Sequence, residues 1–255
     1  YVFFNHLRDS SFVDTTLTIH KDYKFNYLRK DNFNLISFGN LGQTYNTLSY
    51  DLTNPKLTPE FGARARHFNY MELEDINYFS VPTPLTEIMY KTGFTQGQVL
   101  DALFSTNISR QFNFSIAYKG MRSLGKYQHT LTSTGNFRFT SNYFSKNQRY
   151  KMFGHVVMQD LMNEENGGLT DEGVENFVSG NDEFKDRSVF SPQFEDAESM
   201  LRGRRYFLNH NYNLSNSKDS LSGSLELGQK LVFEDKYFQY IQNAAKTDLF
   251  GEVYS

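Results

Sequence analysis

The stretch that comes nearest to a nucleotide-binding motif runs from Gly120 to Tyr127 and reads G-M-R-S-L-G-K-Y. A G-x-x-x-x-G-K pattern directly after a predicted strand is typical of a loop that binds phosphates. Such a loop needs Ser or Thr after the lysine to hold magnesium, and then a helix whose N-terminal amides bind the phosphates. Tyr127 follows Lys126 instead, and the next residues, Q-H-T-L-T-S-T, favour a strand. We therefore interpret 120–127 as a surface loop.

The other residues capable of chemistry form no recognisable catalytic motif. The six histidines show neither an H-E-x-x-H pattern nor an i, i+4 pair that would indicate a zinc site. The sequence has no G-x-S-x-G elbow, and its lack of cysteine excludes disulfides, thiolate nucleophiles and cysteine metal sites. A catalytic site whose residues converge only in the folded protein would leave no such motif. We predict a protein that is not an enzyme and has no cofactor.

Acidic residues are concentrated in one part of the chain. From Asp160 to Met200 there are 12 Asp and Glu against Lys185 and Arg187. Clustered carboxylates can bind hard divalent cations, but the D-x-[DN]-x-[DN]-G spacing of a calcium loop is missing. We predict a long acidic extracellular loop over 160–202, which holds Ca²⁺ or Mg²⁺ loosely rather than at a defined site. The residues Q-F-E-D-A-E-S-M-L within it are expected to form a short helix.

Basic side chains are dispersed along predicted strands. They do not form the single patch that binding to nucleic acid would require, so we expect no nucleic-acid partner. In a soluble protein they would be a solvated exterior, whereas in a membrane barrel they would line the lumen and favour anions. The candidate pore-lining residues are Lys119, Arg138, Lys151, Arg205 and Lys230.

The segment Q-F-N-F-S-I-A-Y-K-G, residues 111–120, shows the strand pattern most clearly. Apolar and small or polar side chains alternate strictly, which gives an extended strand one apolar and one polar face. The apolar face would contact a protein core in a soluble sandwich and lipid in an outer-membrane barrel. Similar patterns cover 100–109, 135–144, 149–159, 205–214 and 224–234. The candidate lipid-facing residues are Phe112, Phe114, Ile116, Tyr118, Phe137 and Phe139.

Strand length and loop length favour the membrane barrel. The strands are about 10 residues long, which suits a tilted strand that crosses a bilayer. Their connections alternate between short (109–111, 145–148) and long (121–134, 160–202), as in an up-and-down barrel. Weaker segments at 16–29, 41–51, 67–80 and 86–92 raise the expected total to about ten strands. A transmembrane helix is excluded, because no apolar run exceeds the four residues 1–4.

Long stretches of the chain resemble the putative porin family of Bacteroidota outer membranes. The resemblance covers about 14–250, and its runs are DYKFNYLRKDNFNLISFGNLGQTYNTLSYD, FGARARHFNYMELEDINYFSVPTPLTEIMYKTGFTQGQVLDALF, FNFSIAYKGMRSLGKYQHTLTSTGNFRFT and QDLMNEENGGL. It implies an all-β fold, a transmembrane antiparallel up-and-down β-barrel in the bacterial outer membrane that passes small hydrophilic solutes. The implied partners are outer-membrane lipid and lipopolysaccharide, those solutes, and additional membrane protein subunits.

The family also sets an expectation about completeness. Its members are longer, and this chain ends at FGEVYS without an aromatic-terminated closing strand. We therefore expect residues 1–255 to form a single β-barrel domain, or a segment of one that belongs to a larger barrel. Two alternatives stay open: a non-conducting structural or accessory barrel in an envelope complex, and a ligand-binding β-sandwich.

Overall fold

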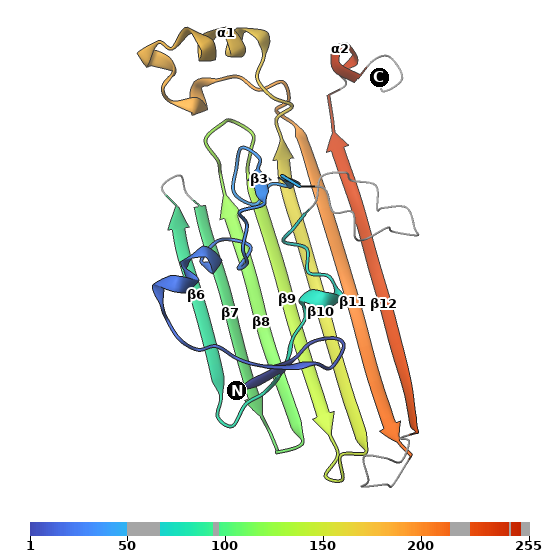
Figure 1. Ribbon diagram of the computed structural model, residues 1–255. Coiled ribbons are helices and arrows are strands. Elements are labelled where there is room, and N and C mark those ends of the chain that lie inside the picture. The colour runs from blue at the N-terminus through green and yellow to red at the C-terminus, as the bar shows by residue number, and fades with distance from the viewer. Residues whose placement is uncertain (50–66, 94–96, 215–224, 245, 251–255) are drawn as a thin grey trace.

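An antiparallel sheet of seven strands dominates the computed structural model, which describes residues 1–49, 67–93, 97–214, 225–244 and 246–250 (Figure 1). In the sheet each strand pairs with its neighbours in sequence, in the order β12-β11-β10-β9-β8-β7-β6. This confirms the all-β fold and the antiparallel up-and-down order, but the described residues form an open sheet and not a closed barrel. The strands are β6 (Leu85–Gly93), β7 (Gly97–Asn107), β8 (Phe112–Ser123), β9 (Thr132–Phe144), β10 (Tyr150–Glu165), β11 (Ala197–Asn213) and β12 (Glu226–Gln242).

The strands on either side of the acidic loop are longer than the sequence predicted. β10 and β11 stay paired up to Glu165 opposite Ala197, so the loop between them is 166–196 and not 160–202. Glu164 and Glu165 fit in a strand because their carboxylates accept hydrogen bonds from β11 and from the residue that directly precedes β9. Glu165 accepts from Ser199 Oγ at 2.6 Å, and Glu164 accepts from the Leu131 amide at 2.8 Å. The predicted loop 121–134 likewise shrinks to 124–131.

The helix of the acidic loop lies earlier than predicted. The end of the predicted helical segment, from Ala197 onward, belongs to β11, and α1 (Asp171–Ser179) forms instead. The Thr170 hydroxyl caps α1 by accepting from the Gly173 amide at 3.2 Å, and the left-handed Gly180 ends it. Two short 3₁₀ turns follow, at Asp182–Phe184 and Arg187–Val189, and α2 (Thr247–Phe250) lies near the C-terminus. Within the described residues, no helix has the length and apolar character needed to cross a membrane.

Residues 1–49 and 67–84, which we name the cover, lie across one face of the large sheet (Figure 1). The predicted strands at 16–29, 41–51 and 67–80 are therefore wrong as parts of a barrel wall. The first contains a 3₁₀ helix, and the others contain only three-residue strands, although the end of 41–51 lies outside the described residues. Only the prediction at 86–92 became a strand of the large sheet, β6. The cover consists of β1 (Val2–Phe4), β2 (Ser10–Phe12), β3 (Leu35–Ser37), β4 (Tyr45–Thr47), β5 (Tyr78–Ser80), and 3₁₀ helices at Ile19–Lys24 and Leu73–Asp75.

The hydrophobic core lies between the cover and the sheet. Ile76 and Tyr78 of the cover pack on Phe153, Val157 and Phe207 of β10 and β11. A second cluster joins Tyr27, Leu28 and Tyr45 to Met89, Val99 and Met121, and a third joins Tyr70 to Leu161 and Leu201. Each such side chain contributes about 1.5–3 kcal/mol when fully buried. These clusters attach the cover firmly to what we name the covered face of the sheet.

The opposite face of the sheet, which we name the exposed face, carries apolar side chains that nothing covers among the described residues. On this face Ile88, Leu100, Phe104, Ile116, Tyr118, Phe137, Met158, Tyr206, Tyr212, Leu231, Phe233, Tyr237 and Ile241 are all exposed. They come from all seven strands and so spread across the whole width of the sheet.

Candidate functional site

The two faces of β8 differ sharply in polarity. Ile116 and Tyr118 are 42% and 47% exposed, whereas Lys119, on the opposite face, is only 3% exposed and Ser115 is buried. Phe112 and Phe114 are half-buried beside Ile116 and Tyr118 on the exposed face. A soluble protein normally buries its apolar face and exposes its polar one. β8 shows the reverse arrangement.

The predicted site residues fall into two groups by face. The five basic residues Lys119, Arg138, Lys151, Arg205 and Lys230 all lie on the covered face, and the six predicted lipid-facing residues all lie on the exposed face. Period-2 alternation was enough to separate the two groups by face, whereas pore lining and lipid contact stay predictions. The sequence did not reveal that the cover lies over Lys119, Arg138 and Arg205.

Lys119 is held beneath the cover. Its ammonium nitrogen Nζ donates to Asn69 Oδ1 at 2.5 Å and lies 5.0 Å from the centre of the Tyr27 ring. Nearby, Arg138 Nη2 donates to Asp101 Oδ1 at 3.2 Å, and Arg29 of the cover approaches the same carboxylate. These contacts join the cover to β7, β8 and β9.

Arg205 occupies a similar position farther along the sheet and is only 1% exposed. Its Nη2 donates to the Met71 carbonyl at 2.9 Å, and its Nε donates to His155 Nε2 at 3.1 Å. Its Nη1 lies 3.4 Å from Glu234 and 3.9 Å from Glu72.

Carboxylate partners reduce the charge that these arginines project. Asp101 lies against Arg138, and Glu234 and Glu72 lie against Arg205, so each positive charge has a negative charge within 4 Å. The sequence-based argument for a lumen that favours anions counted the basic residues without these partners. Among the residues that the structure describes, Lys230 and Lys151 form no ion pair, and Lys230 is exposed next to the Phe207 ring, at 5.7 Å.

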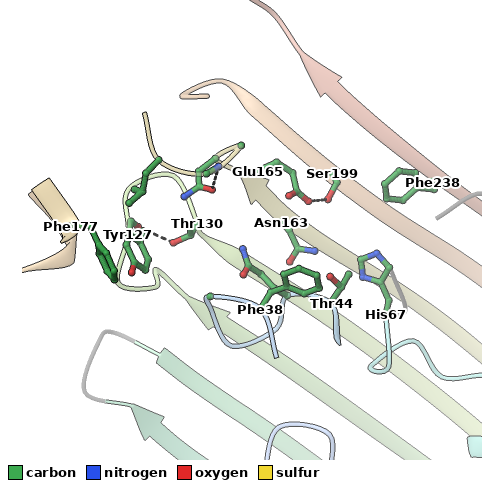
Figure 2. A pocket seen from close by; sticks show the side chains of 16 residues that line it. Phe38, Thr44, His67, Tyr127, Thr130, Asn163, Glu165, Phe177, Ser199 and Phe238 are labelled. Atoms are coloured by element: carbon green, nitrogen blue, oxygen red, sulfur yellow. Dashed lines mark hydrogen bonds between the residues drawn. The ribbon is translucent and has the colours of Figure 1, made fainter. Parts of the chain in front are cut away.

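A cavity of about 630 Å³ lies at the end of the sheet that carries the acidic loop (Figure 2). Its walls come from three parts of the chain that are far apart in sequence. The cover contributes the β3–β4 hairpin and His67, the loops after β8 and β10 contribute the rim, and strands β10, β11 and β12 form the floor. The aromatic lining residues are Phe38, His67, Tyr127, Phe177 and Phe238, and the polar ones include Gln43, Thr44, Thr130, Asn163, Glu165, Asn166 and Ser199.

Polar groups within the cavity are fixed by hydrogen bonds. Ser199 Oγ donates to Glu165, and Thr130 Oγ1 donates to the Tyr127 carbonyl at 2.9 Å (Figure 2). His67 lies next to Phe238, with 6.3 Å between ring centres. Burial, and then the positive charge of Lys236, lowers the pKa of His67 to about 4, so that its ring is neutral at pH 7. Among the described residues, the cavity is therefore lined by hydrogen-bonded polar groups and by one carboxylate.

Sequence reasoning missed this cavity. Its lining residues lie between Phe38 and Phe238, and no short motif connects them. The only local signal is the pair Gly167 and Gly168, whose left-handed backbone turns the chain sharply after β10.

The structure bears on two other stretches that were considered in the sequence, the segment 120–127 and the acidic loop. Strand β9 and not a helix follows Lys126, so 120–127 does not form a phosphate loop. In the part of the chain that the structure describes, no group of three or more His, Cys, Asp or Glu could hold a metal ion. Loosely bound divalent cations at the acidic loop stay a prediction.

Comparison with known proteins identifies a family. A family model described as "Putative porin" matches residues 1–255. Neither a curated protein nor a solved structure matches the chain.

Proposed function

The chain belongs to the putative porin family, and we propose that it forms part of the wall of an outer-membrane β-barrel through which small hydrophilic solutes diffuse. In this proposal the exposed face contacts lipid and the covered face lines the lumen. The basic residues Lys119, Arg138, Lys151, Arg205 and Lys230 then face the lumen side.

The inverted polarity of β8 carries the proposal. An exposed row of Ile116 and Tyr118 opposite buried Ser115 and Lys119 fits a strand with lipid on one side and a polar interior on the other. A ligand-binding β-sandwich would need a second sheet over the apolar face, and none of the described residues lies there.

Strand length and sheet edges add support. Strands β7 to β12 have 11 to 17 residues, and a tilted strand crosses a bilayer with about 9–11. Among the described residues, β6 and β12 each pair on one side only. Unpaired backbone groups are very costly in lipid, so the proposal includes further strands, from this chain or another subunit, that pair with these two edges.

The proposed barrel also predicts where the acidic loop lies. α1 and the loop 166–196 lie beyond the end of the sheet, on the side we propose as extracellular (Figure 1). There the carboxylates would bind Ca²⁺ or Mg²⁺ loosely and share these ions with the phosphates of lipopolysaccharide.

Site-directed spin labelling tests the orientation of the sheet. The chain has no cysteine, so single cysteines can be introduced at Ile116 and, as the matched control, at its neighbour Ser115. In the full-length protein in lipid vesicles, oxygen should increase the spin relaxation rate of the label at 116, because oxygen concentrates in lipid. The relaxation rate of the label at 115 should not increase. Equal responses at the two sites would contradict the proposed orientation.

A second function, a non-conducting accessory barrel, is favoured by the cover itself. The cover buries Lys119 and Arg205, which would otherwise face an open lumen. Planar-bilayer recordings on the full-length protein separate the two functions. Steady channels and vesicles permeable to small sugars support diffusion, whereas an electrically silent protein in sealed vesicles supports the accessory role.

A further inference from the structure

The cavity at the loop end of the sheet has the size of a binding site for a small molecule. Its volume of about 630 Å³ lies within the range of about 300–1,000 Å³ that is usual for ligand pockets. Such pockets combine a mainly apolar lining with a few fixed polar groups. The lining here has that composition, with aromatic rings next to hydrogen-bonded side chains.

A single charged side chain lines the cavity among the described residues. That residue is Glu165, whose carboxylate accepts a hydrogen bond from the Ser199 hydroxyl at 2.6 Å. A hydroxyl group carries no charge, and among the described residues Glu165 forms no ion pair, whereas Arg187 and Lys236 lie against Phe177 and His67 instead. His67 also lines the cavity, and its imidazole ring is neutral at pH 7. The electrostatic character of the cavity therefore favours a cation.

Aromatic rings from several parts of the chain line the same cavity as this carboxylate. Phe38 comes from the cover, Phe177 from α1 and Phe238 from β12 (Figure 2). The face of an aromatic ring attracts cations, and the ring also packs against hydrocarbon. Phe177 already attracts the Arg187 guanidinium, which lies 4.3 Å from its ring centre. The space next to Glu165 is thus the more suitable place for a ligand's charge.

We propose that this cavity binds a small organic cation, whose ammonium group contacts Glu165 and whose hydrocarbon part packs among Phe38, Phe177 and Phe238. The assignment deepens the proposed function, because it names the class of solute that would bind at the mouth of the lumen. It differs from a lumen that favours anions, which the dispersed basic residues alone suggested.

A pair of probes of equal shape tests the charge requirement. Choline and its uncharged analogue 3,3-dimethyl-1-butanol are titrated into the full-length protein in detergent micelles, with calorimetry as the readout. Benzyltrimethylammonium serves as a larger cationic probe. We expect the two cations to bind and the neutral alcohol to bind at least about tenfold more weakly. Equal binding of choline and the alcohol, or no binding of either cation, would overturn the proposal.

Variants locate the site. Glu165→Gln should weaken choline binding about tenfold, and Phe238→Leu should weaken binding of the benzyl cation. Glu198→Gln is the matched control, since Glu198 lies on the next strand with its side chain on the other face of the sheet. An unchanged affinity in Glu165→Gln would overturn the assignment. Comparing choline with the alcohol on the unaltered protein remains decisive if a variant does not fold.

Bilayer recordings keep this inference separate from the proposed function. If the protein conducts but binds no cation, the inference fails and diffusion stands. If it binds choline in micelles but is silent in bilayers, the cavity assignment stands and diffusion fails.

Discussion

Arg205 Nη2 donates to the Met71 carbonyl oxygen at 2.9 Å, across 134 positions of the sequence. The same peptide segment is also held by β10, because the Met71 amide donates to Gln159 Oε1 at 2.9 Å and Gln159 Nε2 donates back to the Met71 carbonyl at 3.1 Å. The cover is therefore fixed to the middle of the covered face by polar contacts as well as by apolar packing. Its retention should depend on single residues of the sheet.

Substituting Arg205 should loosen the cover. Arg205→Ala removes the bond to Met71 and takes away the guanidinium beside Glu234, whereas Glu72 keeps its ion pair with Lys236 at 2.9 Å. Since a hydrogen bond to a charged group contributes about 1.5–3 kcal/mol, we expect a local destabilisation of that order. Hydrogen exchange of 67–76 should accelerate about tenfold or more. Lys230→Ala is the control, because Lys230 is exposed on the same face. Equal protection of 67–76 in both variants would show that the arginine does not hold the cover.

Adding one methyl group at Gly203 should have a similar effect by a different mechanism. A Cβ atom there would lie 1.9 Å from the Tyr70 hydroxyl oxygen, so Tyr70 must leave its position. Tyr70 would then lose its 2.8 Å hydrogen bond to Glu234. Overpacking of this kind costs about 1–3 kcal/mol, and the expected result for Gly203→Ala is faster proteolysis of the cover.

Two comparisons make the Gly203 result specific. Gly154→Ala should be mild, because its nearest contact is an ordinary 3.4 Å to the Phe207 carbonyl. In Tyr70→Ala, the added Gly203→Ala change should cost almost nothing, since the clash is gone. A full additional loss in the double variant would contradict the contact between Gly203 and Tyr70.

The sheet was largely predictable from sequence, because the alternation of apolar and polar side chains that identifies each strand lies within a few consecutive residues. On β8, alternation alone separated Ile116 and Tyr118 from Lys119. The ends of β10 and β11 were mispredicted because Glu164 and Glu165 resemble loop residues. They stay in the sheet because both pair with β11 and because their carboxylates accept hydrogen bonds from Leu131, which directly precedes β9, and from Ser199 of β11.

The cover and the cavity were not predictable, because they depend on contacts between residues that lie far apart in the sequence. The strands of the cover are three residues long, too short for a period of two to show. Its defining contact, between Arg205 and Met71, joins positions that no sequence pattern relates. The cavity likewise exists only where Phe38, Glu165 and Phe238 meet in the folded chain.

A charge on the exposed face should prevent insertion into a bilayer. Ile116→Lys would place an ammonium group in the apolar row of β8, which costs about 2–4 kcal/mol near the midplane of a membrane barrel. We expect less folded protein in vesicles, measured by the fraction that is protected from protease and resists unfolding in detergent gels. Gln148→Lys, in the turn between β9 and β10, is the control. Normal insertion of Ile116→Lys would count against lipid contact at this position.

Mild acid should release the end of the cover that begins at His67. Burial first, and the positive charge of Lys236 second, together lower the pKa of His67 from its usual 6.5 to about 4. Above pH 6.5 the ring is neutral whether the cover is attached or detached, so the attached state has its full stability. Between pH 6.5 and 4 the detached ring binds a proton and the attached ring does not. Stability is therefore lost as the pH falls through this window.

Hydrogen exchange measures this loss directly. Protection factors for 67–76, corrected for intrinsic exchange, should fall between pH 7.5 and pH 4.5 in the unaltered protein. His67→Gln keeps a polar side chain but cannot gain the proton, so its protection should change less over the same range. Because other groups titrate equally in both proteins, the difference between the two curves isolates His67. Parallel curves would mean that protonation of His67 does not govern attachment of the cover.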